Sequence, residues 1–285
     1  MSGSRPGPGS DAGPAGVAGA AAATRPAGAA GERAVGGAGV DAAVRGAGVD
    51  AAVGGAAVDA AVAVIGTALE RVFGAVAEMA AGAAAAHRGA RERGARLCDA
   101  DVTALREPVL ALLRRESELA VGMGLILAPG LLADRSLRME WWQAEPDPVL
   151  LEVDLNPGSV GFYDYAAAEW FTVPRRTGRR HVVGPYVDVH GTDRYLLTLT
   201  VPVLDGAEFV GVAGADVPVA WFESLVLREL GAVTTDGAEV DVVVVNDDGR
   251  VVLSTSPDRL VGSRAGALPG RERALSSPSW RVVVR

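Results

Sequence analysis

Aromatic and acidic residues gather in one stretch of the chain, between residues 163 and 216. The stretch reads Tyr-Asp-Tyr-Ala-Ala-Ala-Glu-Trp-Phe at 163–171, His-Val-Val-Gly-Pro-Tyr-Val-Asp at 181–188 and Val-Gly-Val-Ala-Gly-Ala-Asp at 210–216. These residues recur at the ends of predicted elements, where pocket-lining side chains usually lie. Carboxylates beside aromatic faces suit a cation, through charge-assisted hydrogen bonds and cation–π contact. The stretch therefore predicts a small-molecule pocket for a ligand that carries an amine.

The carboxylates and tyrosines of this stretch have structural alternatives. Asp216 ends the apolar run 210–215, so it either contacts a ligand or caps the helix expected after it. Asp188 comes just before a turn, and a turn role competes evenly with ligand contact. Tyr163 and Tyr186 are better pocket candidates, because a buried tyrosine hydroxyl needs a hydrogen-bond partner.

The tryptophans and Phe171 could likewise belong either to the pocket or to the core. Trp170 and Phe171 form either a pocket wall or plain core, since aromatic side chains dominate core burial. Trp141 and Trp142 fall on opposite faces of a predicted strand. One of this pair is expected in the core, and the other could close the pocket.

Two kinds of segment precede the pocket stretch. Residues 1–57 are rich in Gly, Ala and Pro and bury too little apolar surface to offset their ordering entropy, so they are predicted to be a disordered tail. Residues 58–119 are predicted to be helical, with a second helix over about 98–119. Pro108 limits this helix, either by kinking it or by starting a new helix at its first turn. The first helix carries apolar residues in alternating steps of four and three, which indicates either packing on its own domain or a dimer seam. The seam comprises Val58, Val62, Ile65, Leu69, Val72, Val76, Met79, Ala83 and Ala86.

Residues 120–285 are predicted to form one α+β domain, in which the long N-terminal helices pack on an antiparallel sheet. Helices are expected over 163–178 and 219–230. Short turns such as Asp205-Gly206 join several of the strands, and strands joined in this way cannot be parallel neighbours. The expected strands are 122–128, 138–143, 149–154, 182–189, 195–204, 208–216, 240–246, 250–254 and 280–285.

Three motifs resemble the Cache family, the PAS-like extracytoplasmic sensor domains of chemoreceptors and sensor kinases. They are Tyr-x-x-x-x-x-Glu-Trp-Phe at 163–171, Gly-Pro-Tyr-x-Asp at 184–188 and Val-Gly-Val-x-Gly-x-Asp at 210–216. The similarity covers roughly residues 120–255 and leaves out 1–57. It implies a PAS-like sheet with a ligand pocket.

The resemblance also implies roles for individual residues. In amino-acid-binding Cache domains, aromatic residues and an Arg on the pocket helix hold the ligand's carboxylate, and a Tyr with two Asp holds its ammonium. The aromatic positions correspond here to Tyr163, Trp170 and Phe171, and the ammonium positions to Tyr186, Asp188 and Asp216. The Arg position is Ala168, which cannot bind a carboxylate, so the resemblance implies an amine more readily than an amino acid.

Charge and composition exclude several classes of protein. The net charge is −8, with all basic residues Arg, and the low pI of about 5.0 argues against nucleic acid as a partner. The histidines His87, His181 and His190 fit no metal motif, and no catalytic or cofactor motif is present. We therefore expect no enzyme activity, no metal and no cofactor.

The expected location is cytoplasmic. Cys98 is the only cysteine, so no intrachain disulfide can form, and the first residues do not read as a secretory signal. Charged residues interrupt the apolar window 58–86, which argues against a membrane span.

Together these observations predict a ligand-sensing module that binds a small amine or an amino-acid-like ligand and reports to a separate signalling partner that the sequence does not name. The alternative is a ligand-free structural protein that keeps the fold and forms a homodimer through 58–86.

Overall fold

The computed structural model describes residues 40–144, 146–189, 194–233 and 241–285, with side chains from Gly55 onward. Residues 45–285 form one compact unit. Of the other unit, residues 1–44, only the first residues of helix α1 (Val40–Glu92) are described. The predicted tail at 1–39 lies outside the described residues.

Helix α1 begins earlier than the sequence analysis predicts. Residues 40–57 are helical rather than disordered. The physical reason is composition: this segment is rich in Ala, the strongest helix former, and contains no Pro.

The apolar seam of α1 packs on the chain's own core. Val58, Ile65, Leu69, Val72 and Val76 are all almost completely buried. This packing favours the intrachain interpretation of the seam, because these five side chains already contact the chain's own core.

A stretch of α1 is also long and apolar enough to cross a membrane, judged by length and composition alone. It spans Gly55–Glu92, has a mean hydropathy of 1.6 in its most apolar window, and 44% of that window is buried inside the molecule. A helix that packs on a core passes the same test, so this finding does not decide between the two.

Six antiparallel strands form the larger sheet, in the order β3-β2-β1-β6-β5-β4. The predicted meander over β4, β5 and β6 is confirmed, and its Asp205-Gly206 turn closes β5 onto β6 with Gly206 at φ +66°. The strands are β1 (Gly122–Leu127), β2 (Met139–Gln143), β3 (Val149–Leu150), β4 (His181–Val187), β5 (Tyr195–Asp205) and β6 (Glu208–Pro218).

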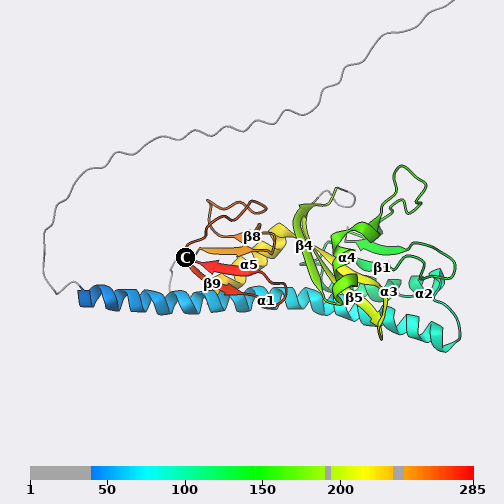
Figure 1. Cartoon of the computed structure of the whole chain (residues 1–285), viewed down its shortest axis with the longest axis horizontal. Coiled ribbons are helices and arrows are strands. Elements are labelled where there is room, and N and C mark those ends of the chain that lie inside the picture. The colour runs from blue at the N-terminus through cyan, green and yellow to red at the C-terminus, as the bar shows by residue number, and fades with distance from the viewer. Residues whose placement is uncertain (1–39, 145, 190–193, 234–240) are drawn as a thin grey trace, which may run out of the picture. The chain divides into compact units, whose positions relative to one another are not determined.

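Helices cover both faces of this sheet (Figure 1). On one face lie α1, α2 (Asp99–Thr103) and α3 (Arg106–Arg115). Of the two alternatives at Pro108, the structure has the second: a new helix begins at Arg106, and Pro108 occupies its first turn, where no helical N–H bond is lost. On the other face lie the 3₁₀ turn η1 (Tyr165–Ala167) and α4 (Glu169–Thr177), which ends at Gly178 with φ +64° as predicted.

The last part of the chain builds a second sheet of four strands, in the order β8-β7-β10-β9. Its strands are β7 (Val242–Val245), β8 (Val251–Ser254), β9 (Arg271–Ala274) and β10 (Arg281–Val284), reached through helix α5 (Val219–Val233). Strand β9 was not predicted, because it reads Arg-Glu-Arg-Ala, is exposed throughout and lacks apolar alternation. The sequence does not decide whether this region extends the first sheet. In the structure it forms a separate sheet.

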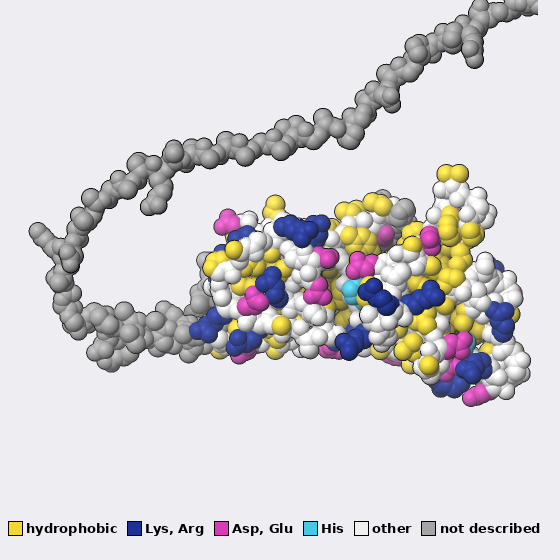
Figure 2. All heavy atoms as spheres, in the orientation of Figure 1, with side chains coloured by type: hydrophobic (Ala, Val, Ile, Leu, Met, Phe, Trp, Pro, Cys, Tyr) yellow, Lys and Arg dark blue, Asp and Glu magenta, His cyan; other side chains and the backbone are white. Residues whose placement is uncertain are grey.

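The visible surface carries interspersed acidic and basic side chains rather than a field of one sign (Figure 2).

Candidate functional site

A narrow cavity lies on the sheet face that η1 and α4 cover. Five of the six residues singled out by sequence line it: Tyr163, Trp170, Tyr186, Asp188 and Asp216. Its volume is about 30 Å³, measured as the space open to the centre of a water-sized sphere. That is room for only a few waters or one small headgroup.

Strand register brings the polar residues of the cavity together. Asp216 on β6 lies directly opposite Thr198 on β5 and Gly122 on β1. Because side chains alternate along a strand, Thr198 and Asp216 point to the same face of the sheet. Thr198 was missed by sequence reasoning, since a threonine inside an apolar strand has no distinguishing signal.

Tyr186, Thr198 and Asp216 form a hydrogen-bonded chain. The Thr198 hydroxyl donates to Asp216 Oδ1 at 2.6 Å, and Tyr186 Oη lies 2.7 Å from Thr198 Oγ1. A threonine hydroxyl has one proton, so once Thr198 donates to Asp216 it can only accept from Tyr186. The Tyr186 proton then points toward Thr198, and the lone pairs of the Tyr186 oxygen can accept a hydrogen bond from a group in the cavity.

Asp216 is part of strand β6 and does not cap the next helix. Helix α5 begins at Val219, whereas the Asp216 carboxylate bonds Thr198 on the neighbouring strand. Only 6% of Asp216 is exposed. The geometry therefore favours the ligand-contact interpretation over the helix-cap interpretation.

Trp141 is the aromatic residue of β2 that lines the cavity, and its indole acts on the Asp216 carboxylate to lower the pKa of that group. Two glycines of the sheet make room for this ring. A Cβ on Gly122 would lie 2.8 Å from Trp141 Nε1, and one on Gly214 would lie 3.1 Å from Trp141 Cη2. Glycine is therefore required beneath the ring at these positions. The sequence alone predicts neither this requirement nor that Trp141, rather than Trp142, lines the cavity.

Burial changes the acidity of the cavity groups. It raises the pKa of Asp216 to about 7, with the Asp188 charge adding to the effect and the hydrogen bonds opposing it. Burial and the two carboxylates raise the pKa of Tyr163 to about 12, and burial also raises the pKa of Tyr186. Both phenols are therefore neutral at physiological pH, and Asp216 is held near its titration point.

Asp188 reaches the cavity from just beyond the end of β4. Its backbone N–H donates to the Arg194 carbonyl at 3.0 Å, which continues the ladder between β4 and β5, while its half-buried side chain lines the cavity. The backbone of Asp188 can therefore take part in the strand pairing while its side chain lines the cavity. The turn itself, at residues 190–193, lies outside the described part of the chain.

Phe171 is the one predicted site residue that does not line the cavity. It is fully buried and packs edge-on against Trp170 and Phe209, with ring centroids 6.2 and 5.4 Å apart. Helical spacing is the reason: consecutive residues on α4 point in different directions, so only Trp170 faces the cavity while Phe171 supports it from behind.

The Arg that Ala168 replaces has no substitute in the cavity. No arginine is among the described residues that line it, and Arg175 lines a separate cleft. Glu169 turns away and lies 2.9 Å from His181 Nε2. The cavity therefore offers carboxylates and no cation.

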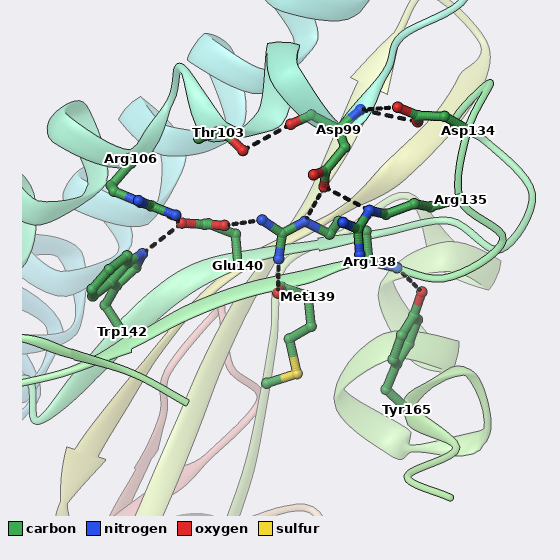
Figure 3. A network of polar contacts seen from close by, with 10 residues as sticks. All are labelled: Asp99, Thr103, Arg106, Asp134, Arg135, Arg138, Met139, Glu140, Trp142 and Tyr165. Atoms are coloured by element: carbon green, nitrogen blue, oxygen red, sulfur yellow. Dashed lines mark hydrogen bonds and ion pairs between the residues drawn. The ribbon is translucent and has the colours of Figure 1, made fainter. Parts of the chain in front are cut away.

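A buried ionic network on the opposite face holds β2 in place (Figure 3). Glu140, which is fully buried, accepts hydrogen bonds from Arg106 Nε at 3.2 Å and Trp142 Nε1 at 2.8 Å, and also pairs with Arg138. Trp141 lies between Glu140 and Trp142 in sequence, so the network anchors the strand segment that presents Trp141 to the cavity.

No protein-family model and no curated protein matches this sequence. Among solved structures, the methyl-accepting chemotaxis protein X matches with 19% identity over 83% of this chain and 98% of that one, at a TM-score of 0.54. The chain has a Cache-like fold. This agrees with the three motifs, which lie where the resemblance places them: on α4, on β4 and on β6.

Two further structures have TM-scores below 0.5. The ligand-binding domain of the Pseudomonas aeruginosa amino acid chemoreceptor PctC, solved with GABA, is 16% identical over 83% of this chain and 97% of that one, at 0.48. That of the Pseudomonas fluorescens chemoreceptor CtaA, solved with L-isoleucine, is 12% identical over 81% and 88%, at 0.49. At such identities similarity describes the fold, and the ligand of the Cache-like cavity must be argued from its own residues.

Proposed function

We propose that this chain is a ligand-sensing module that binds a small amine in its Cache-like cavity and reports to a separate partner. The observation that carries the proposal is the hydrogen-bonded chain of Tyr186, Thr198 and Asp216. When the Asp216 carboxylate is ionised, Thr198 donates to it and accepts from Tyr186, so both end groups present acceptors to the cavity. A ligand with several N–H donors and a positive charge satisfies them.

The walls support the same ligand class. Tyr163, Trp141 and Trp170 bring aromatic faces to the cavity, and such faces attract a cation through the ring quadrupole. Asp188 and Asp216 provide the opposite charge. The small cavity volume suits one ammonium headgroup, and a longer ligand requires outward movement of α4 or of the 151–163 segment.

A zwitterionic amino acid suits the cavity less well. Its carboxylate would meet two aspartates and no arginine among the described lining residues. An unpaired buried charge costs several kcal/mol, so the amine without the carboxylate is the better ligand.

The test is a thermal-shift and calorimetry screen of the full chain. Each amine is paired with its acid counterpart, such as propylamine with propionate and putrescine with succinate, and β-alanine serves as the zwitterion. A ligand at about 100 times its dissociation constant should stabilise by roughly 2.7 kcal/mol. The amines should shift the melting temperature, and the acids should not.

Two variants tie the shift to the cavity. Asp216→Asn removes the charge and should abolish amine binding, and Thr198→Val should weaken it about tenfold, because the acceptor geometry of Tyr186 and Asp216 is lost. Asp258→Asn, an exposed carboxylate outside the cavity, is the control. Binding that survives Asp216→Asn, or a response to acids alone, would refute the proposal.

The alternative, a ligand-free homodimer, loses the interface assigned to it. The 58–86 seam is buried in the chain's own core. If no amine in the screen shifts the melting temperature, this interaction role through another face becomes the better account. The cytoplasmic location remains a separate expectation, and fractionation of cells that express the tagged chain tests it.

A further inference from the structure

A second, larger cleft lies outside the amine cavity, on the far side of α4. Its walls are the C-terminal end of α1, the loop after it, the turn at residues 128–131, the start of β6 and the last turn of α4. By the same measure as the amine cavity its volume is about 520 Å³. Nothing in the amine-binding proposal makes use of it.

The charged side chains of this cleft are mostly arginines. Arg91, Arg96 and Arg175 line it against one carboxylate, Glu208. Counting Arg and Glu only, the lining residues carry three positive charges and one negative charge, a net of +2, whereas the whole chain carries −8. A local positive site on an acidic protein calls for a specific explanation.

The carboxylates near the cleft are already neutralised. Asp205 lies 3.0 Å from His87 and 3.4 Å from Arg91, and Glu208 lies 3.6 Å from Arg91. Arg91 therefore shares its charge with these two acids. The positive charge that remains belongs to Arg96 and Arg175.

Arg96 is fixed in the cleft wall without a carboxylate partner. Its Nη2 donates to the carbonyl oxygens of Gly130, Leu131 and Leu132 at 2.5, 3.0 and 3.0 Å. These neutral acceptors position the guanidinium but leave its charge intact. In the described part of the chain its Nε–H and Nη1–H groups have no acceptor, and they are the donors that an oxyanion binds.

Arg175 supplies a second guanidinium. It is exposed in the last turn of α4, lines the cleft, and has no ion-pair partner within the described residues. A basic residue in this position also complements the helix dipole. Arg176 complements the dipole equally well, but it does not line the cleft. A comparison of variants at Arg175 and Arg176 therefore distinguishes a specific binding role from a general effect of charge.

We propose that this cleft binds an oxyanion, a carboxylate or a phosphate group, between Arg96 and Arg175. Arginine is suited to both groups, because its planar fork donates two parallel hydrogen bonds to two oxygens. The fixed orientation of Arg96 reduces the entropy lost on binding. Since the net charge of the chain opposes approach of an anion, we expect modest affinity that weakens as salt is added.

The experiment titrates the full chain with malonate and with inorganic phosphate at matched ionic strength, with chloride as reference, by calorimetry and thermal shift. Heat and stabilisation from malonate alone identify a carboxylate site, from phosphate alone a phosphate site, and from both a general oxyanion site. No response beyond chloride for either probe overturns the proposal.

Two neighbouring variants localise the site. Arg175→Gln should weaken the affinity about tenfold, as expected for one lost charge-assisted contact, and Arg176→Gln should leave it unchanged. Both side chains are exposed, so both variants should fold, and circular dichroism checks this. Equal weakening by the two variants would mean diffuse attraction to the end of α4 and would overturn the proposed site.

Discussion

At the residue scale, Asp216 combines the proposed binding role with a cost to stability. Its carboxylate is almost fully buried, lines the same cavity as Asp188 and accepts a hydrogen bond from Thr198. Burial therefore raises its pKa from the ordinary 3.8 to about 7. An amine bound beside Asp216 would stabilise the ionised carboxylate. Because such a ligand binds only the folded chain, its binding would also stabilise the fold.

The sign of the resulting pH dependence follows from proton linkage. Between pH 3.8 and about 7 the folded chain holds a proton on Asp216 that the unfolded chain has lost. The stabilisation from this proton is complete below the lower value and is lost as the pH rises through the higher one, amounting to about 4 kcal/mol.

Asp216→Asn removes this titration. In urea unfolding, the free energy of unfolding of the variant should exceed that of the wild type at pH 8, and the difference should shrink as the pH falls toward 4. The control Asp258→Asn should follow the wild type at every pH. A difference between Asp216→Asn and wild type that does not vary with pH would contradict the assignment.

At the element scale, the β5–β6 hairpin is fastened to the C-terminal part of α1. Asp205 lies at the turn and is only 8% exposed. It accepts from His87 Nδ1 at 3.0 Å and from Arg88 Nε at 3.2 Å, and it contacts Arg91. Because β5 and β6 carry Thr198 and Asp216, this contact ties the strands of the cavity to α1.

Two hairpins of the chain allow a matched comparison. Asp205-Gly206 and Asp248-Gly249 are both Asp-Gly turns, with Gly206 at φ +66° and Gly249 at φ +72°. Asn supports such turns as well as Asp does, so Asp→Asn changes charge without changing turn preference.

Asp205→Asn should lower the melting temperature by several degrees, because Arg88 and Arg91 lose their counterion and the contact with His87 is weakened, whereas Asp248→Asn should have little effect. Differential scanning calorimetry at pH 7 measures both. Similar melting temperatures for the two variants would mean that the α1 contact contributes little to stability.

At the scale of the whole molecule, α1 is shared by both sheets (Figure 1). In its N-terminal half, Asp59 pairs with Arg273 of β9 at 3.1 Å. Further along, Arg71 pairs with Glu116 at 2.9 Å, and at the far end His87 meets Asp205. Apolar residues from α1 and from both sheets belong to one continuous core.

This arrangement predicts the effect of truncation. Removal of residues 1–39 should leave the melting temperature unchanged, because the body of the molecule is formed by 45–285. Removal of residues 1–92 should prevent folding rather than only dissociate a dimer, because it takes the α1 side of the core with it. Circular dichroism and gel filtration distinguish the outcomes, and a folded, monomeric 93–285 would refute the prediction.

The sequence alone determined much of the local structure. Period-two alternation, the Asp205-Gly206 turn and the Gly178 stop are short-range signals, so the β4–β5–β6 meander and the end of α4 were predictable. The heptad seam of α1 also predicted a buried face. The prediction of disorder was wrong at residues 40–57, where the Ala-rich sequence is helical. Strand β9 was missed, because an exposed edge strand has no apolar pattern to detect.

Only the tertiary structure decided which residues share the cavity. The motifs supplied Asp216 and Tyr186, but the link between them, Thr198, depends on the register of β5 against β6. The choice of Trp141 over Trp142 and the exclusion of Phe171 depend on which face of β2 and of α4 points inward. Strand register and helix rotation are set by packing of elements far apart in sequence, and local residue preferences do not encode them.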